Sequence, residues 1–256
     1  TGVNEFIIDG NQTSTITVAV DDANSDNDFD PVVDQTVSAT TTDNDTAGFT
    51  IVQSGGSTSV AETGTTDTFT IVLNAQPASD VVLSITSGDT GEATTTSTLT
   101  FTAGNWNSTQ TVTVTGADDN IIDGTITSTI TVAVIDAISD NDFDGVANQT
   151  VSATTTDNDV AGFTITQTDG STSVAETGTT DTFTIVLNAQ PASNVVLTVT
   201  SSDTGEATVN TPLTFTNANW NTPQTVTVTG VNDNLVDGTI TSTVTVAVND
   251  GSSDNN

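Results

Sequence analysis

Apolar and polar positions alternate along most of this chain with a period of two residues. Phe69, Ile71 and Leu73 are separated from one another by single Thr or Val residues. Successive side chains of a β-strand point to opposite faces, so this alternation is typical of half-buried strands. Short runs of this kind, bounded by Gly, Asn, Asp or Pro, lie at 49–51, 69–73, 81–85, 99–101, 112–114, 130–134 and 151–153.

No stretch shows the spacing of an amphipathic helix. About seven short strands within roughly 110 residues predict an all-β fold of seven-stranded antiparallel β-sandwiches. Trp106 precedes the fifth of these strands, and Trp220 occupies the equivalent place later in the chain. We expect each Trp to cover one end of a hydrophobic core.

The chain repeats itself with a period of 114 residues. The run Ser57–Ser79 returns unchanged at Ser171–Ser193, and residues 47–142 align with 161–256 without a gap at 72 identities in 96 positions. Such self-similarity is typical of tandem arrays. We therefore predict three parts: the C-terminal part of a repeat, a complete repeat, and a repeat that lacks its last strand, at 1–45, 46–159 and 160–256.

The opening residues belong to the same register, because the run TSTITVAV at 13–20 recurs at 127–134. Incomplete repeats at both ends lead us to expect a segment of a longer chain that continues with the same period. Residues 13–20 and 36–41 should then form strands of an incomplete sandwich, or complete a sandwich of a neighbouring copy.

The charge of the chain excludes several classes of function. Asp and Glu total 33, whereas Lys, Arg and His are absent, so the net charge is -33. Binding to nucleic acid or to anionic lipid needs basic residues. No apolar run approaches the length of a membrane span, so we expect no membrane insertion. Without imidazole, amine, guanidinium or thiol groups, and with the same acids in every repeat, we do not expect an enzyme.

The acidic residues gather at the ends of predicted strands. Asp and Asn are common in turns, which explains part of this distribution. It does not explain carboxylates placed side by side in a chain that offers no basic side chain. Calcium takes six to eight oxygen ligands in a flexible arrangement. The clusters therefore predict bound Ca²⁺.

Four motifs resemble the Calx-β domain, a calcium-binding sandwich of immunoglobulin-like type. They are Val60-Ala61-Glu62-Thr63-Gly64, Leu99-Thr100-Phe101, Thr111-Val112-Thr113-Val114 running into Asp118-Asp119, and Asp157-Asn158-Asp159. The resemblance covers the whole 114-residue period, and it is greatest to tandem Calx-β arrays of giant bacterial extracellular proteins. It implies calcium at one end of each sandwich.

The resemblance also implies the ligands. In the complete repeat they are Glu62, either Asp89 or Glu92, Asp118, Asp119, Asp123, Asp157 and Asp159. In the later repeat they are Glu176, either Asp203 or Glu206, Asp233 and Asp237, with Asn232 where the complete repeat has Asp118. In the first part they are Asn4, Glu5, Asp9, Asp43 and Asp45.

A second acidic motif precedes the last strand of a repeat. The sequence Asp-Asn-Asp-Phe-Asp occupies 26–30 and again 140–144. Its carboxylate spacing resembles the start of a calcium loop, but the Gly and the distal Glu of an EF-hand are missing. Two interpretations stay open: an additional ion, or a loop that Phe29 and Phe143 pin to the sandwich while the acids face water.

The expected function is a structural segment of a long extracellular fibre or adhesin stalk, rigidified by Ca²⁺ at the ends of the sandwiches. The alternatives are a calcium-sensing module and a carbohydrate- or surface-binding adhesin repeat. Absence of Cys and an acidic, Thr-rich composition suit an extracellular or cell-surface location. The expected partners are neighbouring copies of the repeat, and Asn11, Asn107 and Asn148 stand in sequons that could take glycans.

Overall fold

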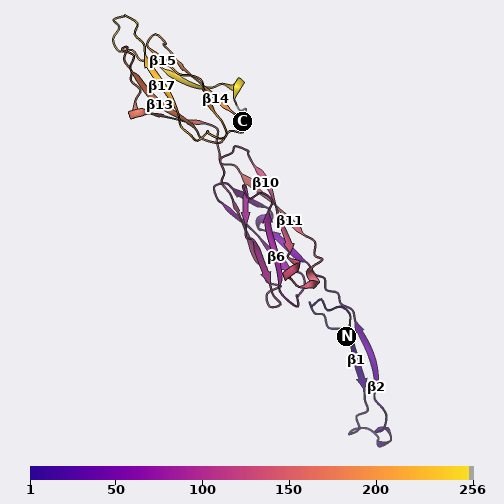
Figure 1. Cartoon of the computed structure of the whole chain (residues 1–256). Coiled ribbons are helices and arrows are strands. Elements are labelled where there is room, and N and C mark those ends of the chain that lie inside the picture. Colours follow the sequence, from indigo (N-terminus) through magenta and orange to yellow (C-terminus); the bar gives the residue numbers. More distant parts are fainter. Residues whose placement is uncertain (254–256) are drawn as a thin grey trace. The chain divides into compact units, whose positions relative to one another are not determined.

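The computed structural model describes residues 1–253 and is all-β (Figure 1). Its described residues contain no α-helix, only three-residue 3-10 turns, and none of these helical turns could cross a membrane. The chain divides into two compact units. One comprises Thr1–Val60, Gly64–Ala117 and Thr127–Thr155, and the other comprises Ala61–Thr63, Asp118–Ile126 and the chain from Thr156 onward. Residues 254–256, which end the expected third part, lie outside the described residues.

The stretch from Phe49 to Thr156 forms two sheets. The first has the order β3-β5-β9-β7, with β3 at Phe49–Gln53, β5 at Thr66–Leu73, β9 at Gln110–Gly116 and β7 at Ala93–Thr95. The second has the order β4-β11-β10-β6-β8, with β4 at Thr58–Ala61, β11 at Gln149–Thr156, β10 at Ile126–Val134, β6 at Val81–Ser87 and β8 at Thr98–Phe101. Every predicted run lies in one of these strands. The structure adds two short strands, β4 and β7.

The alternation of residue types places one face of each strand in the core. Along β5, Phe69, Ile71 and Leu73 are buried, whereas Thr70 and Val72 are half-exposed. The opposite sheet contributes buried residues in the same way, and the two sets form one hydrophobic cluster. Burying each large apolar side chain stabilises the fold by about 1.5–3 kcal/mol. Trp106 packs against this cluster, as the sequence predicts.

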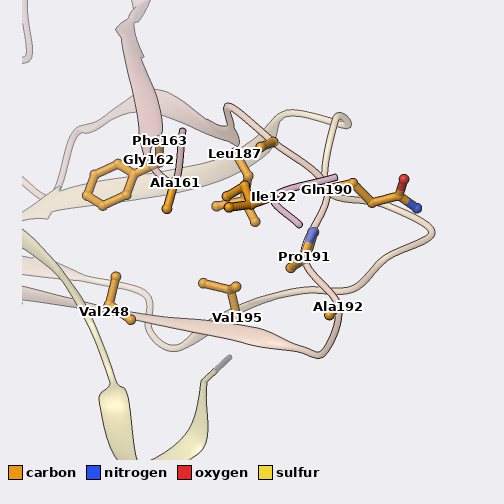
Figure 2. A pocket seen from close by; sticks show the side chains of 11 residues that line it. Ile122, Ala161, Gly162, Phe163, Leu187, Gln190, Pro191, Ala192, Val195 and Val248 are labelled. Atoms are coloured by element: carbon orange, nitrogen blue, oxygen red, sulfur yellow. The ribbon is translucent and has the colours of Figure 1, made fainter. Parts of the chain in front are cut away.

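The later repeat has the same plan. One sheet has the order β12-β13-β17-β15 and the other β16-β14-β18. Their bounds are Phe163–Gln167 for β12, Thr180–Leu187 for β13, Val195–Ser201 for β14, Ala207–Val209 for β15, Leu213–Phe215 for β16, Gln224–Gly230 for β17 and Val244–Val248 for β18. Trp220 packs against the core between them. At one end lies an apolar cavity of about 110 Å³, lined by side chains that include Phe163, Leu187 and Val195 (Figure 2).

The first part of the chain forms a two-stranded ribbon. Strand β1 (Gln12–Val18) pairs antiparallel with β2 (Gln35–Thr41), with Ile16 opposite Val37. Both side chains are more than half exposed, whereas Ile130 and Val151 at the equivalent positions of the complete repeat are buried. Residues 13–18 and 36–41 thus pair as expected but without a core, whereas residues 19 and 20 lie beyond the end of β1.

Candidate metal centre

Carboxylates follow the ends of three strands, and several of them come together around Glu62. Glu62 comes directly after β4, Asp118 and Asp119 come after β9, and Asp157 and Asp159 come after β11. Strands end at turns, where Asp is locally favoured because its side chain accepts hydrogen bonds from nearby backbone N–H groups. Carboxylate oxygens of Glu62, Asp157 and Asp159 lie within 4.8 Å of one another.

Glu62 is the most buried of these acids, with 1% of its surface exposed. Its backbone N–H donates to the Thr156 carbonyl at 3.1 Å, and its Oε2 accepts from the Asn158 backbone N–H at 3.0 Å. Burial raises the pKa of Glu62 above its ordinary value, and the charges of Asp157, Asp119 and Asp123 raise it further, against the hydrogen bond from Asn158. The fold therefore holds this carboxylate where its charge is unfavourable without a cation.

Asp159 resembles Glu62, because burial and neighbouring carboxylates also disfavour its charged form. Its Oδ2 is buried and has no hydrogen-bond partner. Burial raises its pKa, and the charges of Asp157, Asp118, Asp119 and Asp123 add to the shift. A buried oxygen atom without a donor is costly unless something positive approaches it. A bound metal ion would supply that interaction.

Asp157 organises the loops around the group. Its Oδ2 accepts from the backbone N–H groups of Asp123 and Gly124 at 3.1 and 2.9 Å, and its Oδ1 accepts from that of Asp159 at 2.6 Å. These bonds, with that of Gly124 the strongest contribution, lower the pKa of Asp157. Asp118 is linked to this loop by a hydrogen bond, because its Oδ1 accepts from the side-chain amide of Asn158 at 2.9 Å, but it belongs to no group of three neighbouring carboxylates among the described residues.

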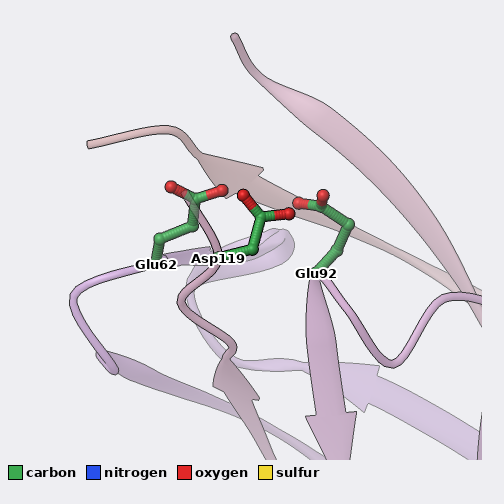
Figure 3. A group of neighbouring side chains, drawn as sticks. All are labelled: Glu62, Glu92 and Asp119. Atoms are coloured by element: carbon green, nitrogen blue, oxygen red, sulfur yellow. The ribbon is translucent and has the colours of Figure 1, made fainter. Parts of the chain in front are cut away.

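The sequence left open whether Asp89 or Glu92 is the ligand, and the structure places these two acids differently. Carboxylate oxygens of Glu92, Glu62 and Asp119 lie within 4.8 Å of one another (Figure 3). Asp89 instead accepts the backbone N–H of Gly91 at 3.0 Å and so closes its own turn. Glu92, and not Asp89, is therefore the acid that reaches the group.

The later repeat holds a second group, formed by Glu206, Asp233 and Asp237, whose oxygens lie within 4.8 Å of one another. Burial, followed by the charges of Asp237, Asp233, Asp203 and Glu176, raises the pKa of Glu206. Asp203 accepts the backbone N–H of Gly205 at 2.9 Å, as Asp89 does with Gly91. Glu176 is half-buried and lies outside the three-residue group.

The first part of the chain reproduces only the loop network. Asp43 accepts from the backbone N–H groups of Asp45, Gly10 and Asp9, at 2.9, 2.8 and 3.2 Å. The bond from Asp45, and then that from Gly10, lowers the pKa of Asp43. Within residues 1–253, neither these acids nor Glu5 belong to a group of three neighbouring carboxylates.

The two Asp-Asn-Asp-Phe-Asp loops differ in their surroundings. Asp140 is buried and accepts from the backbone N–H groups of Ser79 and Asp142 at 2.7 and 3.1 Å. Burial would raise its pKa, but these bonds outweigh it and lower the pKa. Phe143 is fully buried, so it pins its loop as expected, whereas Phe29 is 60% exposed and does not. In the described chain neither loop forms a group of three carboxylates.

Asn158 joins the candidate site although the sequence did not predict it as a ligand. It links Glu62 through its backbone N–H and Asp118 through its side chain. The repetition of Asp-Asn-Asp at 43–45 and 157–159 was the available indication. All the candidate ligand atoms of the group are carboxylate oxygens, which is the ligand type that suits Ca²⁺.

No family model and no curated protein matches this chain. Solved structures similar to it include domains 4 and 5 of the S-layer protein SbsC, at 21% identity and a TM-score of 0.34, covering 57% of this chain and 58% of that one. Another is domains 4–9 of SbsC, at 20% identity and a TM-score of 0.35, covering 93% and 35%.

A third similar structure is the calcium binding domain CBD12 of CALX1.1, at 14% identity and a TM-score of 0.32, covering 70% of this chain and 74% of that one. The chain thus spans little more than half of the first of these structures and about a third of the second. TM-scores of this size do not establish a family. What the structure itself shows is an all-β chain with carboxylate groups that could hold a metal ion.

Proposed function

We propose that this chain is a structural segment of a long extracellular or cell-surface fibre or stalk, in which Ca²⁺ stabilises the ends of tandem β-sandwiches. The parts at 1–45, 46–159 and 160–256 are the repeating units of this proposal. The ions bind through the carboxylates that follow the strand ends. Neighbouring copies of the repeat are the main partners.

The observation that supports calcium most directly is the group of Glu62, Asp157 and Asp159. Glu62 is almost completely buried, and Asp159 has a buried oxygen without a hydrogen-bond donor. The chain has no Lys, Arg or His side chain to compensate them. Burial of unpaired charge is strongly unfavourable. A divalent cation relieves the repulsion within the whole group.

A structural role is supported by the way in which the repeats follow each other. Only six residues, 157–162, separate β11 from β12. In tandem arrays each unit contacts mainly its neighbours, so short connections that are ordered by an ion favour stiffness. The Calx-β resemblance of the sequence agrees with calcium binding, and the repetition of near-identical units agrees with a spacer.

Isothermal titration of the metal-free chain with CaCl₂ tests the proposal. We expect saturable binding with a dissociation constant of about 10⁻⁴–10⁻³ M or tighter, the range of extracellular calcium modules. MgCl₂ at the same ionic strength should bind more weakly, because Mg²⁺ demands a stricter octahedral geometry. Absence of saturable heat with Ca²⁺, with the chain shown to be folded by circular dichroism, would refute it.

A further inference from the structure

The loop 118–126, here called the docking loop, contacts the sandwich of the later repeat through its backbone. The Asn120 carbonyl accepts a hydrogen bond from the Gln190 backbone N–H at 2.7 Å. Ile121 and Gln190 form an isolated parallel β-bridge. Gln190 lies between β13 and β14, so the docking loop adds a short strand-like contact at the beginning of this sandwich.

The next residue of the docking loop adds an apolar contact. Ile122 is half-buried and lines the cavity at the end of the later sandwich, together with Phe163, Leu187 and Val195. Figure 2 shows its side chain among these apolar residues. The loop thus places one Ile against the edge of a hydrophobic core and fixes the neighbouring backbone by a hydrogen bond.

The same contact occurs 114 residues earlier. The Phe6 carbonyl accepts from the Gln76 backbone N–H at 2.6 Å, and Ile7 forms the parallel bridge with Gln76. Ile8 packs against the core of the complete repeat. This occurrence also includes an aromatic pair, because the ring centroids of Phe6 and Trp106 lie 5.5 Å apart. Because equivalent residues form this contact in two repeats, it is a recurring feature of the repeat.

A third copy of the loop lacks a sandwich to contact. Leu235 and Val236 occupy the positions of Ile121 and Ile122, and no sandwich follows them among the described residues. Leu235 is 67% exposed and Val236 is fully exposed. The partial burial of Ile8 and Ile122 therefore comes from the sandwich that follows each loop, and not from the loop's own fold.

We propose that the docking loop is an interaction element whose partner is the beginning of the next repeat, recognised through the Ile122 side chain and the Asn120–Gln190 hydrogen bond. Asp119 and Asp123 flank the three contacting residues, so a ligand at the carboxylates and the next repeat order the same loop. By thermodynamic linkage each then strengthens the binding of the other. This coupling rests on the proposed calcium binding, whereas the docking itself does not.

Amide hydrogen exchange, followed by NMR on the complete 256-residue chain, tests the docking. The Ile122→Ser variant should accelerate exchange of the Gln190 N–H about tenfold or more, because the hydrogen bond to Asn120 opens more often. Exchange of the Gln76 N–H, at the equivalent contact, should not change and serves as the control for folding. The Ile138→Ser variant removes an exposed Ile and should leave both amides unchanged.

Unchanged Gln190 exchange in Ile122→Ser would overturn the proposal. A second measurement, with added CaCl₂, distinguishes failure of the docking from failure of the proposed calcium binding. Adding CaCl₂ should slow Gln190 exchange in the unmodified chain and less so in Glu62→Gln. If calcium has no effect but Ile122→Ser still accelerates exchange, the docking stands and the calcium coupling is wrong.

Discussion

Glu62 and Asp159 combine burial with like charge, two conditions that oppose ionisation in the same direction. Burial is the main cause of the raised pKa of both residues, and neighbouring carboxylates add to it. Asp157 is the opposite case, because three backbone N–H groups stabilise its charged form. Asp157 thus fixes the loops through hydrogen bonds from their backbone, whereas burial and neighbouring charges disfavour the ionised forms of Glu62 and Asp159.

Replacing Glu62 by Gln tests the effect of its buried charge alone. Gln keeps the shape and can still accept the hydrogen bond from Asn158, while the repulsion with Asp157 and Asp119 disappears. We expect the melting temperature of the calcium-free chain to rise by about 2–4 °C, and the additional gain on adding calcium to become smaller. Differential scanning calorimetry measures both.

The control for this variant is Asp136→Asn. It removes one charge from an exposed 3-10 turn and changes the net charge by the same amount. It should leave the calcium-dependent gain intact. Equal behaviour of the two variants would mean that total charge, and not the buried group, governs stability.

The raised pKa values of Glu62, Asp159 and Glu206 predict how stability depends on pH. A carboxyl group with a raised pKa in the folded state binds protons more readily there than in the unfolded chain. Stability of the calcium-free protein therefore rises as the pH falls from 7 toward about 5. The lowered pKa values of Asp157, Asp43, Asp140 and Asp181 act in reverse, so stability falls again at lower pH as these groups are protonated.

If calcium binds as proposed, protons and calcium compete for the same oxygens. The calcium-dependent gain in melting temperature should therefore be greatest near pH 7 and should shrink toward about pH 5. Melting curves with and without CaCl₂ across this range check the expectation. A gain that does not depend on pH would place the calcium somewhere other than at these raised-pKa carboxylates.

At the scale of strands and loops, the strands were predictable because alternation is a local property of the sequence. The choice between Asp89 and Glu92 was not, since both stand in one turn and only the tertiary fold decides which of them faces the group. The cavity that Ile122 lines together with Phe163 and Val195 was not predicted either, because it joins segments that are distant in sequence. Such contacts depend on packing that no local pattern encodes.

The two Asp-Asn-Asp-Phe-Asp loops show this limit most clearly. Their sequences are identical, yet Phe143 is fully buried and Phe29 is 60% exposed. Only the loop that contains Phe143 has a core to pack against. Identical local sequence therefore leads to different burial.

This difference gives a matched pair of variants. Phe143→Ala should destabilise the protein by about 3–5 kcal/mol, the usual cost of emptying a buried aromatic site. Phe29→Ala should change stability by less than about 0.5 kcal/mol, as surface substitutions usually do. Chemical denaturation with urea measures both. A large loss in Phe29→Ala would show that this ribbon packs against something in solution.

At the scale of the whole molecule, 33 acidic residues without a basic side chain repel one another in any compact state. Monovalent salt screens exposed charges but reaches buried groups poorly. The carboxylates after β4, β9 and β11 are the places where a bound ion would remove most of this repulsion. Stability of the fold should then depend on a specific divalent cation beyond its dependence on ionic strength.

The most direct measurement of this dependence is a calcium titration of the melting temperature at constant ionic strength, starting from protein in EDTA. The account predicts a saturable rise of several degrees with CaCl₂ and a smaller rise with MgCl₂, because ligand binding to the folded state stabilises it. A melting temperature in EDTA within about a degree of that in saturating calcium would contradict the central claim.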